Sequence, residues 1–133
     1  MPGMRLSTAI RKGLPMIDEQ SHTEYLHRSG YSVYCQACAL GTALLGADYT
    51  GADPRDQATV CRALAALRVA GSRTYLTRQQ LQEDPVTAPL QEEHFLGRPN
   101  SGKIPLYGVV DQLNYELKLS HESIADWLAS HGW

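Results

Sequence analysis

Apolar residues recur at helical spacing in the C-terminal part of the chain. Between Leu106 and Lys118 they fall at i, i+3, i+4, i+7 and i+11, which predicts an amphipathic helix over this stretch. Ser120 has the position of an N-cap for a last helix, His121–Ser130. The residues expected to face inward from this last helix are Ile124, Trp127 and Leu128. Only Leu119 and Ser120 separate the two helices, so the pair is predicted to form a tight helical corner.

The N-terminal half contains a helix of small residues and a longer helix. Ala37–Leu45 is rich in Ala, Gly and Leu and is predicted to lie at the centre of the core. Gly41 weakens such a helix by on the order of 1 kcal/mol relative to Ala, and a glycine here permits another backbone to approach closely. The longer helix is predicted to begin at Asp53-Pro54, with Asp as N-cap and Pro at N1, and to end at Gly71.

Serine and threonine caps mark three shorter helices. They are predicted at Thr8–Lys12 behind Ser7, from Ser21 through Arg28, and from Thr77 to the neighbourhood of Asp84. In the last two, Glu24 or Gln80 follows the hydroxyl residue by three positions, which is the capping-box spacing. Tyr31–Cys35 alternates large and small residues and is predicted to be a short strand.

Residues 85–105 interrupt this pattern with four prolines and two glycines, which predicts a long surface loop. Taken together, the elements predict a mostly α fold. We expect a single compact domain over residues 1–133, with five to seven short helices and with or without a small β-hairpin. The Ala37–Leu45 helix and the helix that begins at Asp53 are expected to form its centre.

The amino-acid composition is typical of an ordinary globular domain and does not indicate a particular activity. The chain has 133 residues, of which 43% are hydrophobic and 20% charged, as in an ordinary soluble domain. Its first residues lack the apolar core of a secretory signal, and no apolar run approaches the ~20 residues of a membrane helix. The three cysteines are an odd number and no export signal is seen, so we expect reduced thiols and a cytoplasmic location. Because no apolar run is long enough to span a bilayer, no membrane partner is expected.

The charge is unevenly distributed along the chain. The formal net charge of −2 gives no overall attraction to nucleic acid. Residues 1–78 carry nine Lys and Arg against six Asp and Glu, a net charge of +3, whereas residues 79–133 carry three against eight, a net charge of −5. Either these are two surface patches of one domain, or the basic half of one molecule meets the acidic half of a neighbour.

One motif has the spacing of metal chemistry. Cys35 and Cys38 form a C-x-x-C, the spacing of a zinc or redox pair, and His22 and His27 would bring a zinc site to four ligands. The motif runs into an apolar helix, however, and free cysteine is among the most buried residue types. Packing is therefore the favoured interpretation, and no metal or cofactor is predicted.

A second motif, residues 97–104, nearly matches a phosphate-binding loop. Ile104 replaces the hydroxyl that should hold magnesium, and Pro105 prevents a helix from starting where the loop must feed one. Nucleotide binding is therefore not predicted.

The candidate binding residues are four arginines and one histidine. Arg55, Arg62, Arg73 and Arg78 either form a basic face for an anion or acidic partner, or are a solvated surface. His94 follows two glutamates beside the long loop and is the leading candidate for a functional histidine.

The last two helices have helix-turn-helix proportions, but the second helix offers Glu122 and Asp126 rather than basic side chains. The sequence therefore argues against nucleic acid as the partner of this helix pair.

Three segments carry a resemblance. They are Leu6–Gly13, Cys38–Ala47 and Ser120–Leu128, about a fifth of the chain. Their order, LSxAIRxG, then CALGxA, then IADW, resembles that of small uncharacterised bacterial and phage proteins. The resemblance implies a bacterial or phage intracellular origin and assigns Cys38 to a packed helix. It implies no activity.

Three function classes follow. The leading one is a small non-catalytic interaction or regulatory protein of bacterial or phage origin, whose partner is another protein or a second copy. The alternatives are a DNA-associated regulator that uses the C-terminal helix pair, and a small enzyme or ligand binder with a site assembled in space from Cys, His and Glu. No catalytic residue is predicted.

Overall fold

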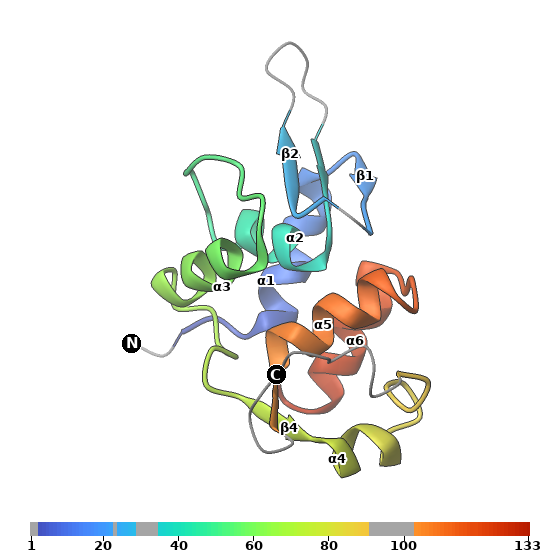
Figure 1. Cartoon of the computed structure of the whole chain (residues 1–133). Coiled ribbons are helices and arrows are strands. Elements are labelled where there is room, and N and C mark those ends of the chain that lie inside the picture. Colours follow the sequence, from blue (N-terminus) through green and yellow to red (C-terminus); the bar gives the residue numbers. More distant parts are fainter. Residues whose placement is uncertain (1–2, 23, 29–34, 91–102) are drawn as a thin grey trace.

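Two short helices pack closely at the centre of the molecule. They are α1 (Leu6–Gly13) and α2 (Ala39–Gly46) in a computed structural model that describes residues 3–22, 24–28, 35–90 and 103–133 (Figure 1). Every residue of α2 is buried, which confirms its predicted place in the core. A Cβ on Gly46 would lie 1.8 Å from the Ala9 carbonyl oxygen, so the two backbones approach more closely than any side chain would allow.

Helices α5 (Leu106–Tyr115) and α6 (His121–Ser130) complete the main core. The predicted stripe of α5 is buried from Leu106 to Leu113. The helix ends three residues before the predicted Lys118, because Lys118 adopts a left-handed backbone conformation (φ 51°) and the Leu119 amide donates to the Leu113 carbonyl oxygen at 3.2 Å. This C-terminal motif forms the helical corner that the sequence predicted.

Helix α3 (Gln57–Ala66) differs from its prediction at both ends. Its N-cap is Asp56, which accepts from the Thr59 amide at 2.7 Å, and Asp53 instead binds the backbone and side chain of Arg28. The helix ends well before Gly71, because Arg68 adopts a positive φ of 61°. Both predicted ends were wrong. The predicted place of this helix at the centre of the core was also wrong: of its ten residues Val60 and Leu64 are buried, and α1 packs against α2 at the centre instead.

A small sheet has the order β1-β3-β2 and lies at one end of the molecule (Figure 1). Its strands are β1 (Glu19–Gln20), β2 (Leu26–Arg28) and β3 (Cys35–Ala37). Strand β3 runs parallel to β1 and antiparallel to β2, with His27 opposite Gln36. The Ser21 hydroxyl does accept from the Glu24 amide at 2.9 Å, yet the chain continues as β2, so the helix predicted through Arg28 was wrong. Backbone pairing of β2 with β3 therefore outweighs the local helix-capping signal at Ser21.

The first helix begins two residues before the predicted Thr8, so the prediction of Ser7 as its N-cap was wrong. Helix α1 starts at Leu6 behind Arg5, with no side-chain cap, and Ser7 is buried within it. It continues into a 3₁₀ turn, η1 (Leu14–Met16). Of the strand predicted at residues 31–35, only Cys35 falls within the described residues, and it begins β3.

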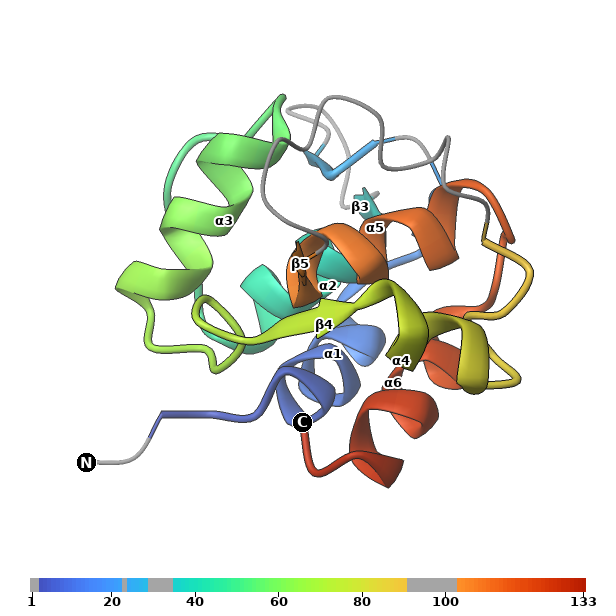
Figure 2. The same cartoon turned by 60° about the horizontal axis from the view of Figure 1, so that its bottom comes forward.

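A second small sheet and a short helix lie at the other end of the molecule. Strand β4 (Tyr75–Thr77) pairs antiparallel with β5 (Lys103–Pro105) and leads into α4 (Arg78–Glu83), as Figure 2 shows. The capping box between Thr77 and Gln80 is present, which confirms that prediction. Strand β5 lies in the range predicted as a loop, and residues 91–102 of that range lie outside the described residues.

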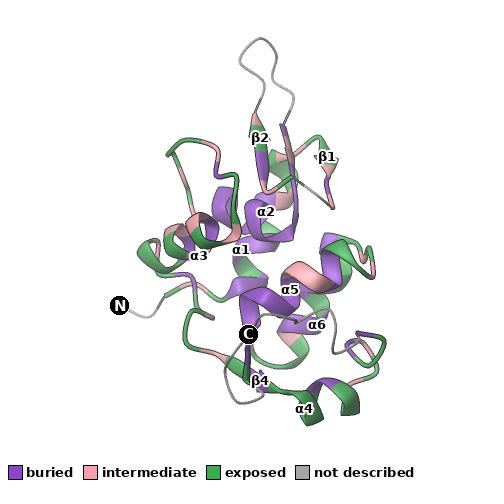
Figure 3. Ribbon diagram, in the orientation of Figure 1, coloured by how far each residue is buried: buried purple, intermediate pink, exposed green. Residues whose placement is uncertain are grey.

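The fold class is therefore mixed rather than mostly α. The described residues contain six α-helices, within the predicted number, but also five short strands in two sheets. Figure 3 shows the burial concentrated in α1, α2 and α5, with α3 and α4 largely exposed. Within the described ranges, no helix combines the length and the apolar character needed to cross a bilayer.

Candidate functional site

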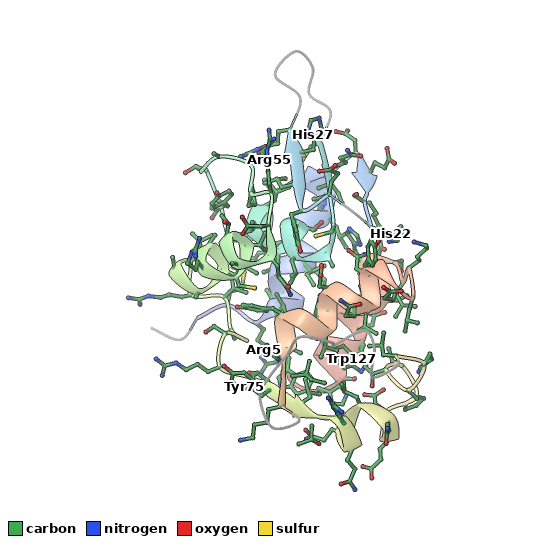
Figure 4. All side chains as sticks on the ribbon, in the orientation of Figure 1. Arg5, His22, His27, Arg55, Tyr75 and Trp127 are labelled. Carbon is green, nitrogen blue, oxygen red and sulfur yellow. The ribbon has the colours of Figure 1, made fainter. Side chains whose placement is uncertain are left out.

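A groove of about 590 Å³ lies between α4 and the C-terminal end of the chain. Its walls come from two stretches far apart in sequence, residues 76–86 and residues 127–133. Its lining residues are Leu76, Gln80, Glu83, Asp84, Pro85, Val86, Trp127, Ser130, His131 and Trp133. Figure 4 shows Trp127 on the side of the molecule toward α4, away from the β2 end. The groove is larger than three others described below.

Three aromatic rings form one wall of this groove. The His131 and Trp133 rings stack with centroids 4.7 Å apart and planes 16° apart. Trp127 meets both rings edge-on, at 5.2 Å from His131 and 5.7 Å from Trp133. Trp127 is 5% exposed, whereas the His131 side chain is 37% exposed. The wall therefore has a fixed inner ring and an accessible outer edge.

The Asp84 carboxylate holds the aromatic wall to the other side of the groove. Its Oδ2 accepts from the Trp127 indole Nε1 at 2.7 Å and lies 2.8 Å from His131 Nε2, while its Oδ1 accepts from the Val86 amide at 2.8 Å. Burial alone would raise the pKa of Asp84, but these hydrogen bonds outweigh it and lower the pKa below its ordinary value. The groove therefore keeps a negative charge at neutral pH.

Local sequence signals explain why these side chains meet. The capping box at Thr77 starts α4, and the chain leaves the helix at Asp84-Pro85, where proline cannot continue it. On the other side, Ser120 caps α6 by accepting from the Ser123 amide, and Gly132 takes a positive φ of 79° that turns the chain after the helix. The turn returns Trp133 beside His131.

A smaller polar pocket of about 270 Å³ adjoins Cys38 at the N-terminus of α2. The residues that line it are His22, Tyr25, Cys38, Asp111, Gln112 and Tyr115. The Cys38 Sγ lies 3.8 Å from the Tyr25 carbonyl oxygen and accepts from the Gly41 amide at 3.5 Å. Burial raises the pKa of the Cys38 thiol to about 12, so the sulfur is a protonated, packed group rather than a thiolate nucleophile.

The four candidate zinc ligands are not gathered at one point. Cys35 packs in a small cluster beneath the β1-β3-β2 sheet, whereas Cys38 belongs to the main core. The His22 Nδ1 lies 2.9 Å from the side-chain Nδ2 of Asn114 and 3.0 Å from the main-chain carbonyl oxygen of the same residue. His27 is exposed on β2. Across the described residues, no three His, Cys, Asp or Glu side chains form a group that could hold a metal ion.

The four arginines do not share one surface. Arg55 lies beside His27 near the β2 end, in a groove of about 400 Å³ that also contains Asp53 (Figure 4). Arg78 begins α4 at the opposite end of the molecule (Figure 1). Between them, Arg62 lies on α3 with its guanidinium 3.5 Å from the Thr59 hydroxyl, and Arg73 is exposed in the turn before β4.

A further groove of about 320 Å³ lies between α3 and α5 and includes Cys61, Tyr75 and Tyr107. The Tyr107 hydroxyl donates to the Val69 carbonyl oxygen at 2.8 Å, so this side chain is already used in the fold. His94 and residues 97–102 of the near phosphate loop lie outside the described residues. Lys103 and Ile104 belong to β5, whereas a phosphate loop would feed a helix at this point.

The C-terminal helix pair places acidic residues outward. His121, the first residue of α6, is completely buried, and its Nε2 lies 2.7 Å from the Ala37 carbonyl oxygen. The exposed Glu122 accepts from the Gln20 amide group, and the exposed Asp126 pairs with Arg11 at 2.7 Å. These carboxylates would repel the phosphates of a duplex.

The sequence did not single out the groove residues as a site. Trp127 was assigned to the core, which its burial confirms, while Asp84 was seen only as the end of a helix. One signal was present: both tryptophans of the chain and His131 lie within its last seven residues. The opposite wall of the groove comes from residues more than 40 positions earlier in the chain, and no short sequence pattern near Trp127 indicates that contact.

Comparisons of the chain with protein-family models, with curated proteins and with solved structures find no match.

Proposed function

We propose that this protein is a small non-catalytic interaction protein that binds a segment of another protein in the groove between α4 and the end of α6. The observation that carries the proposal is that both tryptophans of the chain line this one groove, together with His131 and the Asp84 carboxylate. Tryptophan is enriched among the residues that dominate binding energy at protein interfaces. A partly exposed aromatic wall beside a fixed polar group suits such a role.

The groove also has the construction of a preorganised site. Trp127 donates to Asp84 at 2.7 Å, and the Trp133 amide donates to the Leu128 carbonyl oxygen at 2.9 Å, so the wall is held before any partner arrives. A partner segment then need not order these side chains, which lowers the entropic cost of binding. The resemblance to small bacterial and phage proteins suits an intracellular accessory protein of this kind.

The two other function classes receive less support. For a small enzyme, the best-placed nucleophile is Cys38, but its thiol is buried and protonated at neutral pH. For a DNA-associated regulator, the exposed face of α6 carries Glu122 and Asp126. A strongly salt-dependent association with duplex DNA would reverse this ranking.

A selection from a displayed random-peptide library tests the proposal. Trp133→Ala removes an accessible ring of the wall, and Tyr115→Ala is the matched control, since Tyr115 is an exposed aromatic residue outside the groove. We expect peptides that bind the wild type and Tyr115→Ala but bind Trp133→Ala about tenfold or more weakly. Circular dichroism establishes that each variant is folded. Equal binding to Trp133→Ala, or no enriched peptide, would refute the proposed function.

A further inference from the structure

We infer that the α4–α6 groove binds a basic side chain, lysine or arginine, of an extended segment of another protein. This inference rests on the proposed function and names the chemistry of its partner. Three features of the groove carry it: its charge, its rings and its apolar floor.

The charge of the groove is negative. Asp84, one of the lining residues, is ionised, and the exposed Glu83 precedes it at the end of α4, where its Oε1 accepts from the Gln79 amide group at 3.0 Å. The described residues that line the groove include no lysine or arginine. A basic side chain would therefore meet two carboxylates: the exposed Glu83, and Asp84, which already contacts Trp127, His131 and the Val86 amide.

The rings add an attraction that a neutral ligand does not receive. A cation above the face of an aromatic ring is drawn to its negative quadrupole, and tryptophan is the strongest such partner. The Trp133 ring is partly exposed, stacked on His131 and met edge-on by Trp127, which fixes its orientation. An ammonium or guanidinium group at this wall would lie near both an indole and the Asp84 carboxylate.

The floor of the groove suits the aliphatic part of a lysine or arginine. Leu76, Pro85 and Val86 are the apolar residues that line the groove together with Glu83 and Asp84. Lysine and arginine pack their methylene stems on apolar surface while the charged end reaches polar groups. An acidic segment would be repelled by the carboxylates of Glu83 and Asp84, and a purely apolar segment would form no favourable electrostatic interaction with them.

The groove also belongs to the acidic half of the chain. Residues 79–133 carry eight Asp and Glu against three Lys and Arg. Asp126 pairs with Arg11 and Glu122 binds Gln20, so the acidic residues that line the groove itself are Glu83 and Asp84. A second copy of this chain could supply such a segment from its own basic half. The test therefore includes the oligomeric state.

Short capped peptides with lysine or arginine at the centre are the probes, with norleucine and citrulline analogues as neutral controls. Tryptophan fluorescence follows binding directly, because both tryptophans of the chain line the groove. We expect the basic peptides to bind about fivefold more tightly than their neutral analogues. Glu83→Gln should weaken only the basic peptides, about twofold to threefold, whereas Glu24→Gln, an exposed carboxylate at the other end of the molecule, should change nothing.

Each outcome decides between the inferences. Equal binding of basic and neutral peptides, or no binding of the basic peptides up to their solubility limit, overturns the basic-ligand inference. If the library selection still yields groove-dependent peptides, the proposed function stands and only its ligand class is wrong. Sedimentation that shows a dimer dissociated by Glu83→Gln would identify the occupant as a second copy, and would overturn the inference of a separate partner.

Discussion

Two buried polar side chains, Asn114 and His121, connect the C-terminal helices α5 and α6 to the start of α2 and to β3. Asn114 is 1% exposed, and its Oδ1 accepts from the Ala39 amide at 2.8 Å, at the start of α2. His121 is completely buried, and its Nε2 reaches the Ala37 carbonyl oxygen while its Nδ1 has no hydrogen-bond partner among the described residues. A neutral imidazole that donates from Nε2 fits these surroundings, because a second proton would carry charge into the core.

The pH dependence of stability should report His121. Burial lowers its pKa below the ordinary histidine value, and this outweighs the opposing effects of the Ala37 carbonyl oxygen and Glu122. As the pH falls through about 6.5, the unfolded chain binds the proton before the folded chain does. The free energy of unfolding should therefore be highest above this pH, decrease below it, and level off once the folded state is also protonated.

Denaturant unfolding between pH 5 and 8 measures this effect. His121→Gln keeps an N–H donor for Ala37 but cannot titrate, so the decrease attributable to this position should vanish. His27→Gln, at an exposed position on β2, should keep the wild-type profile. An unchanged profile in His121→Gln would mean that the buried imidazole does not control acid stability.

Replacing Asn114 should destabilise the protein more than a surface change would. Asn114→Ala leaves the Ala39 amide without its acceptor and removes the Nδ2 partner of His22. The expected loss in free energy of unfolding is about 1–3 kcal/mol. Chemical denaturation measures it, with Gln79→Ala on the exposed face of α4 as the control. A loss no larger than that of the control would show that the hydrogen bonds of Asn114 contribute little.

Helix α1 can pack closely against α2 because both helices have a glycine, which lacks a Cβ, at the contact. A Cβ on Gly13 would lie 1.9 Å from the Thr42 carbonyl oxygen, and one on Gly46 would lie 1.8 Å from that of Ala9. Such distances leave no room for a methyl group, so either alanine would force the helices apart. The composition of α2 is therefore a packing requirement of the fold.

Gly46→Ala should accordingly lower the free energy of unfolding by about 2 kcal/mol or more. Gly132→Ala provides the comparison, because a Cβ there would have no described atom within 4 Å and the cost is confined to its positive φ of 79°. That cost should be about 1 kcal/mol. Thermal and denaturant unfolding of the two variants give the difference. If Gly46→Ala were as stable as Gly132→Ala, the close approach of α1 and α2 would be wrong.

Elements could be predicted from the sequence where their determinants are local. The caps at Thr77 and Ser120 and the apolar stripe of α5 each act within one or two turns, and all three are confirmed. Predictions failed where a distant residue competed for the same group. Asp53 binds Arg28 instead of capping α3, and the segment after Ser21 pairs with β3 instead of coiling. Such competition depends on contacts that no short window of sequence contains.

At the scale of the whole molecule, the groove arises only when α4 and α6 are brought together. The sequence predicted both helices and the division of charge, but it could not show that Asp84 would reach Trp127 and His131 across more than 40 residues. The result is an acidic, aromatic-walled groove at the end of the molecule away from β2 (Figures 1 and 4). The binding proposal therefore belongs to the tertiary structure.

A ¹H–¹⁵N spectrum of the labelled protein, titrated with the tightest peptide from the library selection, locates the binding site residue by residue. The chain has two tryptophans, so two indole N–H signals report on the groove. We expect both indole signals to shift, together with the amides of residues 80–84, 86 and 127–133, while those of α3 and β2 stay in place. Shifts centred on α3 or β2, with both indole signals unmoved, would contradict the proposed function.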